Sequence, residues 1–199
     1  MTVTRERFEQ GMSYDAFKTQ MTRNQDRFQA NEQALALDPA DVTVFANLPQ
    51  PLNVLVLAED WCGDVINNLP ILGRLSAESG KLNLRVFLRD QNLDIMDQYL
   101  NQGQFRSIPV FVFFDEQFNE LGRFIERPAS VTERNARQQR ELYAQHPEFG
   151  SPDTPISQLP EDIRAQVMQA TAAARETSRA ANNQDVVSAL RHIVVSAQA

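Results

Sequence analysis

The sequence is poor in the residues that most often carry chemistry. Its 199 residues include one cysteine, Cys62, and two histidines. A single cysteine excludes a disulfide within the chain and fits a reducing compartment. His146 and His192 stand far from each other and from Cys62, so they show no metal-ligand spacing. Because a structural zinc needs three or four ligands, we expect no metal, and no other cofactor is indicated.

Long hydrophobic runs and basic blocks are missing as well. No apolar stretch approaches the roughly 20 residues that span a bilayer. Residues 1–8 include an acid and lack the apolar segment of a signal peptide. The net charge of −7 argues against nucleic acid and anionic membrane surfaces as partners. We therefore expect a soluble, cytoplasmic protein of one domain with an appended element.

The stretch at residues 53–65 organises the chain. An apolar run typical of a strand ends at Glu59-Asp60, and Trp61-Cys62-Gly63-Asp64 then leads into a helical pattern. The first N–H groups of a helix lack internal partners and the helix dipole is positive there, which favours a thiolate at Cys62. Asp64 acts in the opposite direction, because a nearby carboxylate disfavours a thiolate. The alternative is a buried Cys62 that packs as a small hydrophobe.

Hydrophobic periodicity predicts alternating strands and helices through the middle of the chain. The expected elements are strand 52–58, helix 62–79, strand 81–89, helix 92–101, strand 109–114 and strand 120–126. Residues 4–36 are expected to be helical, with Phe17, Met21 and Phe28 on the face that packs on the main domain. Asp38 and Pro39 mark the start of a further short helix.

The composition changes after residue 130. A charged helix is expected over 132–144, followed by a proline-containing loop over 146–160. Residues 161–181 and 184–196 predict an alanine-rich helical hairpin broken at Asn182-Asn183. Its apolar side should pack on the N-terminal helices or on a second copy, so a homodimer is one expectation.

Three separated features resemble the thioredoxin family. They are Trp61-Cys62-Gly63-Asp64, Pro70 inside the following helical pattern, and Ser107-Ile108-Pro109-Val110. The pattern is most similar to the branch whose motif reads Trp-Cys-Gly-Asp-Cys, but Val65 stands at the position of the second cysteine. The resemblance implies an α/β, thioredoxin-like fold, with a central mixed sheet flanked by helices. It divides the chain into N-terminal helices over 1–50, a core over 51–145 and a C-terminal helical extension over 146–199.

The resemblance also implies a site. Cys62 is its catalytic residue, and a cis-Pro109 is expected to lie against it. The substrate-binding surface is formed by Trp61, Gly63, Asp64, Ile108 and Pro109. The buried acid that assists proton transfer in thioredoxins is absent, because its position is Val56. Arg106 either lies at the rim of this site, where it offsets the charge of Asp64, or is an ordinary solvated residue.

Two functions follow from these residues. In the first, Cys62 carries out monothiol redox chemistry or thiol exchange in cell redox homeostasis, with glutathione or a thiol or disulfide peptide or protein as partner. Val65 excludes conventional dithiol reduction, because only one thiol is present to attack. In the second, the protein is a non-catalytic thioredoxin-fold binding or scaffolding module. A depressed pKa of the Cys62 thiol favours the first function, and a normal or raised pKa favours the second.

Overall fold

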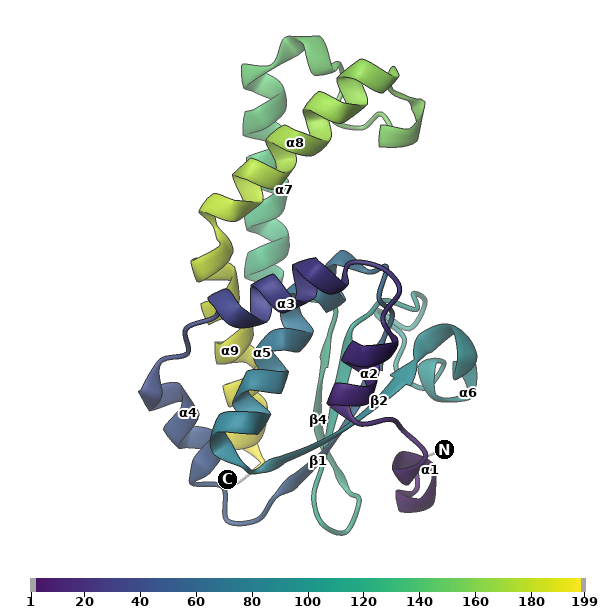
Figure 1. Ribbon diagram of the computed structural model, residues 1–199, viewed down its shortest axis with the longest axis vertical. Helices are drawn as coiled ribbons and strands as arrows, with labels where there is room; N and C mark the ends of the chain where they lie inside the picture. Colours follow the sequence, from purple (N-terminus) through teal and green to yellow (C-terminus); the bar gives the residue numbers. More distant parts are fainter. Residues whose placement is uncertain (1–2, 198–199) are drawn as a thin grey trace. The chain divides into compact units, whose positions relative to one another are not determined.

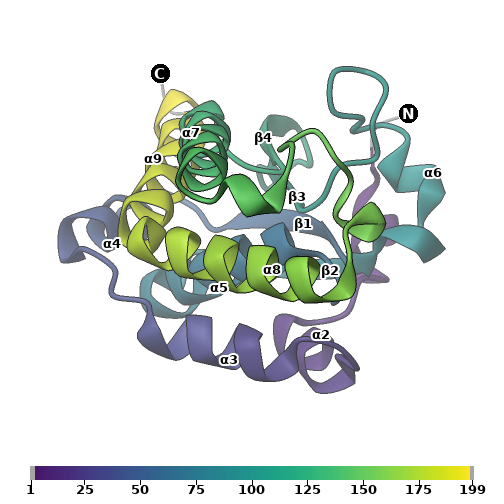
Figure 2. The same cartoon turned by 90° about the horizontal axis from the view of Figure 1, so that it is seen from above.

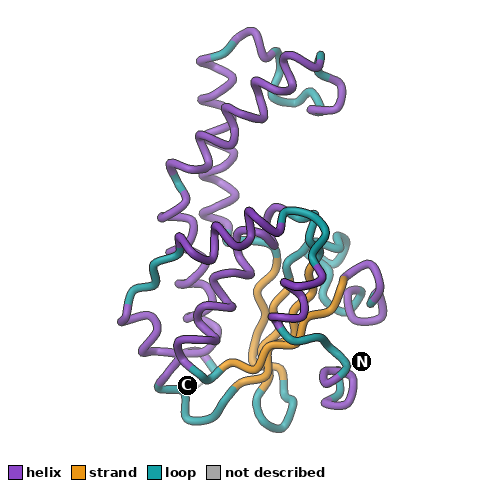
Figure 3. Tube along the Cα trace, viewed as in Figure 1, coloured by secondary structure: helices purple, strands orange, loops and turns teal. Residues whose placement is uncertain are grey.

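The computed structural model describes residues 3–197, which form two compact units. The first unit contains the described residues up to Arg127 and those from Val186 onward, and the second is Pro128–Asp185. A four-stranded mixed sheet with strand order β2-β1-β3-β4 lies in the first unit (Figure 3). The strands are β1 (Leu52–Ala58), β2 (Leu82–Leu88), β3 (Val110–Phe114) and β4 (Glu120–Ile125).

The apolar run that forms β1 lies at the centre of the sheet. β1 pairs in parallel with β2, with Val56 opposite Val86, and antiparallel with β3, with Val56 opposite Phe111. Side chains on both faces of β1 are buried from Val54 to Ala58. Burial on both faces requires a nearly continuous apolar strand, which is what the sequence supplies. The predicted central strand is therefore confirmed.

Within the described residues, four short helices precede the sheet: α1 (Arg5–Glu9), α2 (Tyr14–Gln20), α3 (Gln25–Ala34) and α4 (Pro39–Ala46). The side-chain oxygen of Ser13 accepts a hydrogen bond from Ala16 N–H at 3.1 Å and so caps α2. Phe17, Met21 and Phe28 are buried in the main core, which confirms the packing face predicted for them. The N-terminal helices are therefore part of the first unit and not a loose leader.

Helix α5 (Gly63–Ser79) packs on the sheet, α3 packs against α5, and α2 packs against β2 (Figures 1 and 2). Cys62 is its N-cap, and Gly80 ends it with a φ of 65°, a left-handed conformation that glycine adopts without steric cost. The predicted α/β class, with a mixed sheet flanked by helices, is thus observed.

The segment after β2 differs from the expected helix over 92–101. A 3-10 turn, η1 (Arg89–Gln91), is followed by α6, which covers only Leu93–Met96. Gln102 and Gly103 have positive φ values of 52° and 70°, and they form a turn that pairs Asn101 with Phe105 in an isolated bridge. The helix itself ends earlier, because the hydrogen bonds after Met96 tighten: Gln98 N–H donates to Ile95 O and Tyr99 N–H to Met96 O, both at 3.0 Å.

The second unit is helical. It contains α7 (Ala129–Gln145), η2 (Pro147–Phe149), η3 (Ile156–Gln158), α8 (Glu161–Thr177) and the first turns of α9 (Arg179–Ser196). Its small core consists of Tyr143, Phe149, Leu159 and Val167. The helix break lies at Ser178, not at the predicted Asn182-Asn183. Ser178 is buried and its hydroxyl contacts Arg175 O at 3.1 Å, whereas Asn182 continues α9 with a hydrogen bond from its N–H to Ser178 O at 2.9 Å.

The unit boundaries also differ from the predicted ranges 1–50, 51–145 and 146–199. Helix α7 belongs to the second unit, and the chain from Val186 returns to the first. The cause is packing, because the last turns of α9 bury four apolar side chains in the main core. These are Val186, Val187, Leu190 and Val194. No helix within residues 3–197 is long and apolar enough to cross a membrane.

Candidate functional site

Cys62 lies in the turn between the end of β1 and the start of α5. Cys62 N–H donates to Glu59 O at 3.2 Å and closes a tight turn after the strand. Ile66 N–H then donates to Cys62 O at 3.1 Å, the first hydrogen bond of the helix. A Cβ built on Gly63 would meet no atom within 4 Å. Cys62 is therefore a partly exposed residue at a helix N-terminus, and the neighbouring position at Gly63 is open.

The loop before β3 approaches the same sulfur. The thiol of Cys62 donates a hydrogen bond to the backbone oxygen of Ile108, with a sulfur–oxygen distance of 3.4 Å. The peptide bond that follows, Ile108–Pro109, is cis. The two motifs that the sequence singled out, 46 residues apart, thus meet at one place.

Burial raises the pKa of the Cys62 thiol above its ordinary value. The nearby backbone N–H groups of Val65 and Asp64 lower this pKa, while the carboxylate charge of Asp64 raises it and the charge of Arg89 lowers it. The sequence suggested that the helix N-terminus would lower the pKa of Cys62. In the structure, desolvation of the thiolate raises this pKa by more than the helix N-terminus lowers it. The thiol form of Cys62 therefore predominates at neutral pH.

The charge of Asp64 is balanced by Arg127, a residue that the sequence did not single out. The Arg127 guanidinium donates to the carboxylate of Asp64 and, at 2.6 Å, to that of Glu126. The second oxygen of Glu126 accepts from Asn101 at 2.9 Å. Arg106 does not contact Asp64, because its guanidinium donates to Asp97 instead, at 2.7 and 2.9 Å.

Trp61 lies at the rim of the site. Its side chain is 42% exposed, and the Arg89 guanidinium stacks 4.9 Å from the centre of its ring. Arg89 also donates to the backbone oxygen of Arg106 at 3.1 Å. This contact ties the end of β2 to the loop that carries Ile108, so the rim is a connected structure.

Glu59 and Asp60 have structural partners that the sequence left unassigned. Glu59 is 8% exposed, accepts a hydrogen bond from Asp90 N–H at 2.8 Å, and has a pKa raised by its burial. Asp60 accepts hydrogen bonds from Thr22 N–H and Arg23 N–H at 2.7 and 3.0 Å. Asp60 thereby fixes the α2–α3 loop beside the Cys62 turn. The available signal was an acidic pair placed directly after a buried strand.

Comparison with known proteins places this geometry in a family. A protein of unknown function from Pseudomonas aeruginosa is 22% identical, over 89% of this chain and 99% of its own, with a TM-score of 0.62. An HIV epitope-scaffold is 18% identical, over 94% of each chain, with a TM-score of 0.60. At these identities the likeness concerns the fold alone. No curated protein matches the chain. The family model described as Thioredoxin matches residues 11–140, more than half of the sequence, and the chain belongs to the thioredoxin family.

Proposed function

We propose that the protein performs monothiol exchange at Cys62 with a small disulfide such as oxidised glutathione, or with a peptide disulfide. The observation that carries the proposal is the placement of the only thiol. Its sulfur lies 3.4 Å from Ile108 O, at a helix N-terminus and beside the open surface at Gly63. Cys62 is also partly exposed, which a disulfide needs in order to reach the thiol.

The exchange step requires one thiol from the protein. The Cys62 thiol loses its proton to solvent, the thiolate attacks one sulfur of the disulfide, and the disulfide bond breaks. The Cys62 sulfur is oxidised to a mixed disulfide, and the other half leaves as a thiolate that takes up a proton. Val65 offers no second thiol, so an external thiol must resolve the adduct.

The raised pKa of Cys62 sets the expected rates. Less thiolate is present at neutral pH, so attack is slow. In the reverse direction a thiol of high pKa is a poor leaving group, so attack on the partner sulfur displaces Cys62 slowly. We infer slow formation and slow release of mixed disulfides, which suits retention of a thiol partner better than rapid turnover.

A second candidate is a non-catalytic thioredoxin-fold binding module. The raised pKa of the Cys62 thiol favours this candidate, because a buried cysteine can serve as packing. In this case partners are bound without covalent chemistry, and Cys62 stays reduced when disulfides are present.

Mass spectrometry of the intact protein separates the two candidates. The reduced full chain is incubated with oxidised glutathione at neutral pH and at about pH 9.5, above the ordinary thiol pKa of about 8.5. Monothiol exchange predicts one glutathionyl group per chain, formed faster at the higher pH and absent from the Cys62→Ser variant. A folded wild-type protein that forms no adduct at either pH would instead support the binding module.

A further inference from the structure

A second site lies away from Cys62. The C-terminal half of α5, the start of α2 and the edge of β2 enclose a cleft of about 370 Å³, which is large enough for a small ligand. Gly73 of α5 lines it, and at 1.5 Å per helical residue Gly73 lies roughly 15 Å along the helix from Gly63. The cleft is therefore separate from the candidate thiol site. Its polar lining includes Tyr14, Lys18, Glu32, Arg74 and Arg85.

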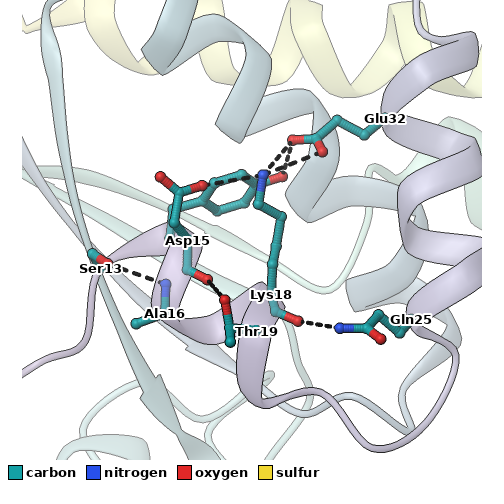
Figure 4. A network of polar contacts seen from close by, with 8 residues as sticks. Ser13, Asp15, Ala16, Lys18, Thr19, Gln25 and Glu32 are labelled. Carbon is teal, nitrogen blue, oxygen red and sulfur yellow. Dashed lines mark hydrogen bonds and ion pairs between the residues drawn. The ribbon is translucent and has the colours of Figure 1, made fainter.

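The acids on one side of the cleft are already neutralised (Figure 4). Glu32 accepts a hydrogen bond from the Tyr14 hydroxyl at 2.7 Å and forms an ion pair with Lys18 at 3.4 Å. Lys18 also contacts Asp15 at 3.2 Å. Burial raises the pKa of Tyr14, and its hydrogen bond to Glu32 raises it further, so the phenol remains a donor. These groups pair with one another, so they do not need a ligand to balance their charges.

The two arginines of the cleft differ in their partners. Arg74 donates to Glu78 at 2.5 and 2.9 Å and to Glu32 O at 3.3 Å. Arg85, in β2, has no ion pair with any described acid, and its buried Nε atom has no hydrogen-bond partner. A partly buried guanidinium without an acid partner is costly, and its planar fork suits a carboxylate. Arg85 is therefore the cation in the cleft that is available to bind an anion.

The edge of β2 adds backbone groups to the same cleft. Leu52 N–H donates to Lys81 O at 2.9 Å, and peptide groups alternate in direction along a strand. In this parallel pairing the N–H and C=O of Leu82, Leu84 and Val86 therefore point away from β1, toward the edge.

Two of these three edge positions have partners. Met12 exchanges two hydrogen bonds with Val86, at 3.0 and 2.8 Å, and the Ser76 hydroxyl donates to Leu82 O at 2.6 Å. Leu84, between them, has no such partner within residues 3–197. A donor and an acceptor on the backbone thus lie beside the unpaired guanidinium of Arg85, and Leu84 and Arg85 both line the cleft.

We propose that this cleft binds the carboxyl terminus of a short peptide. The terminal carboxylate pairs with the Arg85 guanidinium, and the preceding amide exchanges hydrogen bonds with the N–H and C=O of Leu84, as an added strand does at a sheet edge. The Tyr14 ring and the Leu84 side chain supply apolar surface between these contacts. The proposal is independent of thiol exchange at Cys62.

The test uses N-acetyl-alanyl-alanine, its C-terminal amide and acetate as probes, with amide NMR shifts of the full chain as the measurement. The acid should shift Gly73, Leu84 and Arg85. The amide, which lacks the charge-assisted contact, should bind about tenfold more weakly. Acetate should bind more weakly than the acid, because it lacks the peptide amide.

Variants connect the binding to the proposed residues. Arg85→Gln keeps most of the side-chain stem and should lose the preference for acid over amide, whereas Arg85→Lys should keep part of it. Lys81→Gln is the control, because Lys81 is a cation next to the start of β2 that does not line the cleft. This variant should bind the probes as the wild type does. Equal affinity for acid and amide, shifts centred on Cys62, or no binding at millimolar probe would overturn the proposal. So would an Arg85→Gln variant, shown by its spectrum to be folded, that retains the preference.

Discussion

The guanidinium of Arg127 contacts the carboxylate of Asp64, which stands two residues after Cys62. This pair sets the electrostatics of the candidate thiol site. Asp64 alone disfavours a thiolate, and a cation held against it reduces that effect. Because Arg127 also holds Glu126, the pair connects the end of β4 with the start of α5.

Removing either partner of this pair should change the reactivity of Cys62 in opposite directions. Arg127→Gln removes the cation that contacts Asp64 and should slow alkylation of Cys62 at pH 7.5 by about threefold, which corresponds to half a pKa unit. Asp64→Asn should accelerate alkylation by a similar factor. The measurement is the rate of iodoacetamide labelling against pH, with Arg106→Gln as the control, because Arg106 pairs with Asp97. Equal rates in all four proteins would show that the pair does not act on the thiol.

The pKa of Cys62, raised by burial, makes stability depend on pH. Below the ordinary thiol pKa of about 8.5, both folded and unfolded chains keep the proton, and this stabilising contribution is fully present. As pH rises, the unfolded chain ionises first, so the contribution is lost through the folded-state pKa. The stability difference between wild type and Cys62→Ala should therefore shift against the wild type between about pH 8 and pH 10. Urea unfolding at both pH values measures it, and a constant difference would contradict the expectation.

Glu59 predicts a similar effect at acidic pH. Its pKa is raised by burial, so its stabilising contribution is present below about pH 4.3, the ordinary value, and is lost as pH rises through the folded-state pKa. Glu59→Gln keeps an oxygen that can accept from Asp90 N–H and removes the buried charge. The variant should gain stability relative to wild type between pH 4 and neutral pH, as measured by urea midpoints. Glu6→Gln, at an exposed position, should show no such change.

The sequence predicted best those features that follow from local pattern. The apolar run of β1, the helix start at Asp38-Pro39 and the face that carries Phe17 and Phe28 depend on spacing along the chain, and each is observed. The meeting of Cys62 and Ile108 depended on family resemblance, because no local rule brings those motifs together.

Features decided by tertiary partners could not be predicted. Arg106 and Arg127 are both arginines close to a predicted strand, and the sequence does not show which of them lies near Asp64. In the structure Arg127 contacts Asp64, whereas Arg106 contacts Asp97. Ser178 and Asn182 are both polar residues in an alanine-rich run. The helix is interrupted at Ser178, because the buried hydroxyl of Ser178 makes hydrogen bonds there. The protonation preference of Cys62 also depends on burial, which a motif does not report.

The N-terminal helices should contribute strongly to stability. Phe17 and Phe28 are fully buried, with ring centroids 6.1 Å apart at an angle of 64°. Phe28→Ala removes a buried ring and should lower the free energy of unfolding by about 3–5 kcal/mol. Gln29→Ala, at the exposed neighbouring position, should change it by less than about 0.5 kcal/mol. Chemical denaturation gives both values, and a small loss for Phe28→Ala would mean that α3 is not integral to the core.

The absence of a second thiol can be reversed at Val65. This side chain is fully buried and stands three residues after Cys62, about one helical turn along α5. A cysteine at this position would lie close to Cys62 and could attack a mixed disulfide formed there. The wild-type protein should show little catalytic turnover of a protein disulfide with dithiothreitol as donor, because a mixed disulfide at Cys62 has no internal thiol and is resolved only slowly by the external dithiothreitol.

Val65→Cys should gain measurable but modest reductase activity. The gain is modest because burial still raises the pKa of Cys62 and because β1 carries Val56 where thioredoxins place a buried acid. Val65→Ser provides a matched variant without a thiol, and Cys62→Ala combined with Val65→Cys tests whether the new thiol acts alone. Activity only in Val65→Cys would show that the scaffold still holds two thiols in reacting geometry. If Val65→Cys were no more active than Val65→Ser while Cys62 remained open to alkylation, the site would be confined to single-thiol chemistry by its geometry as well as by its sequence.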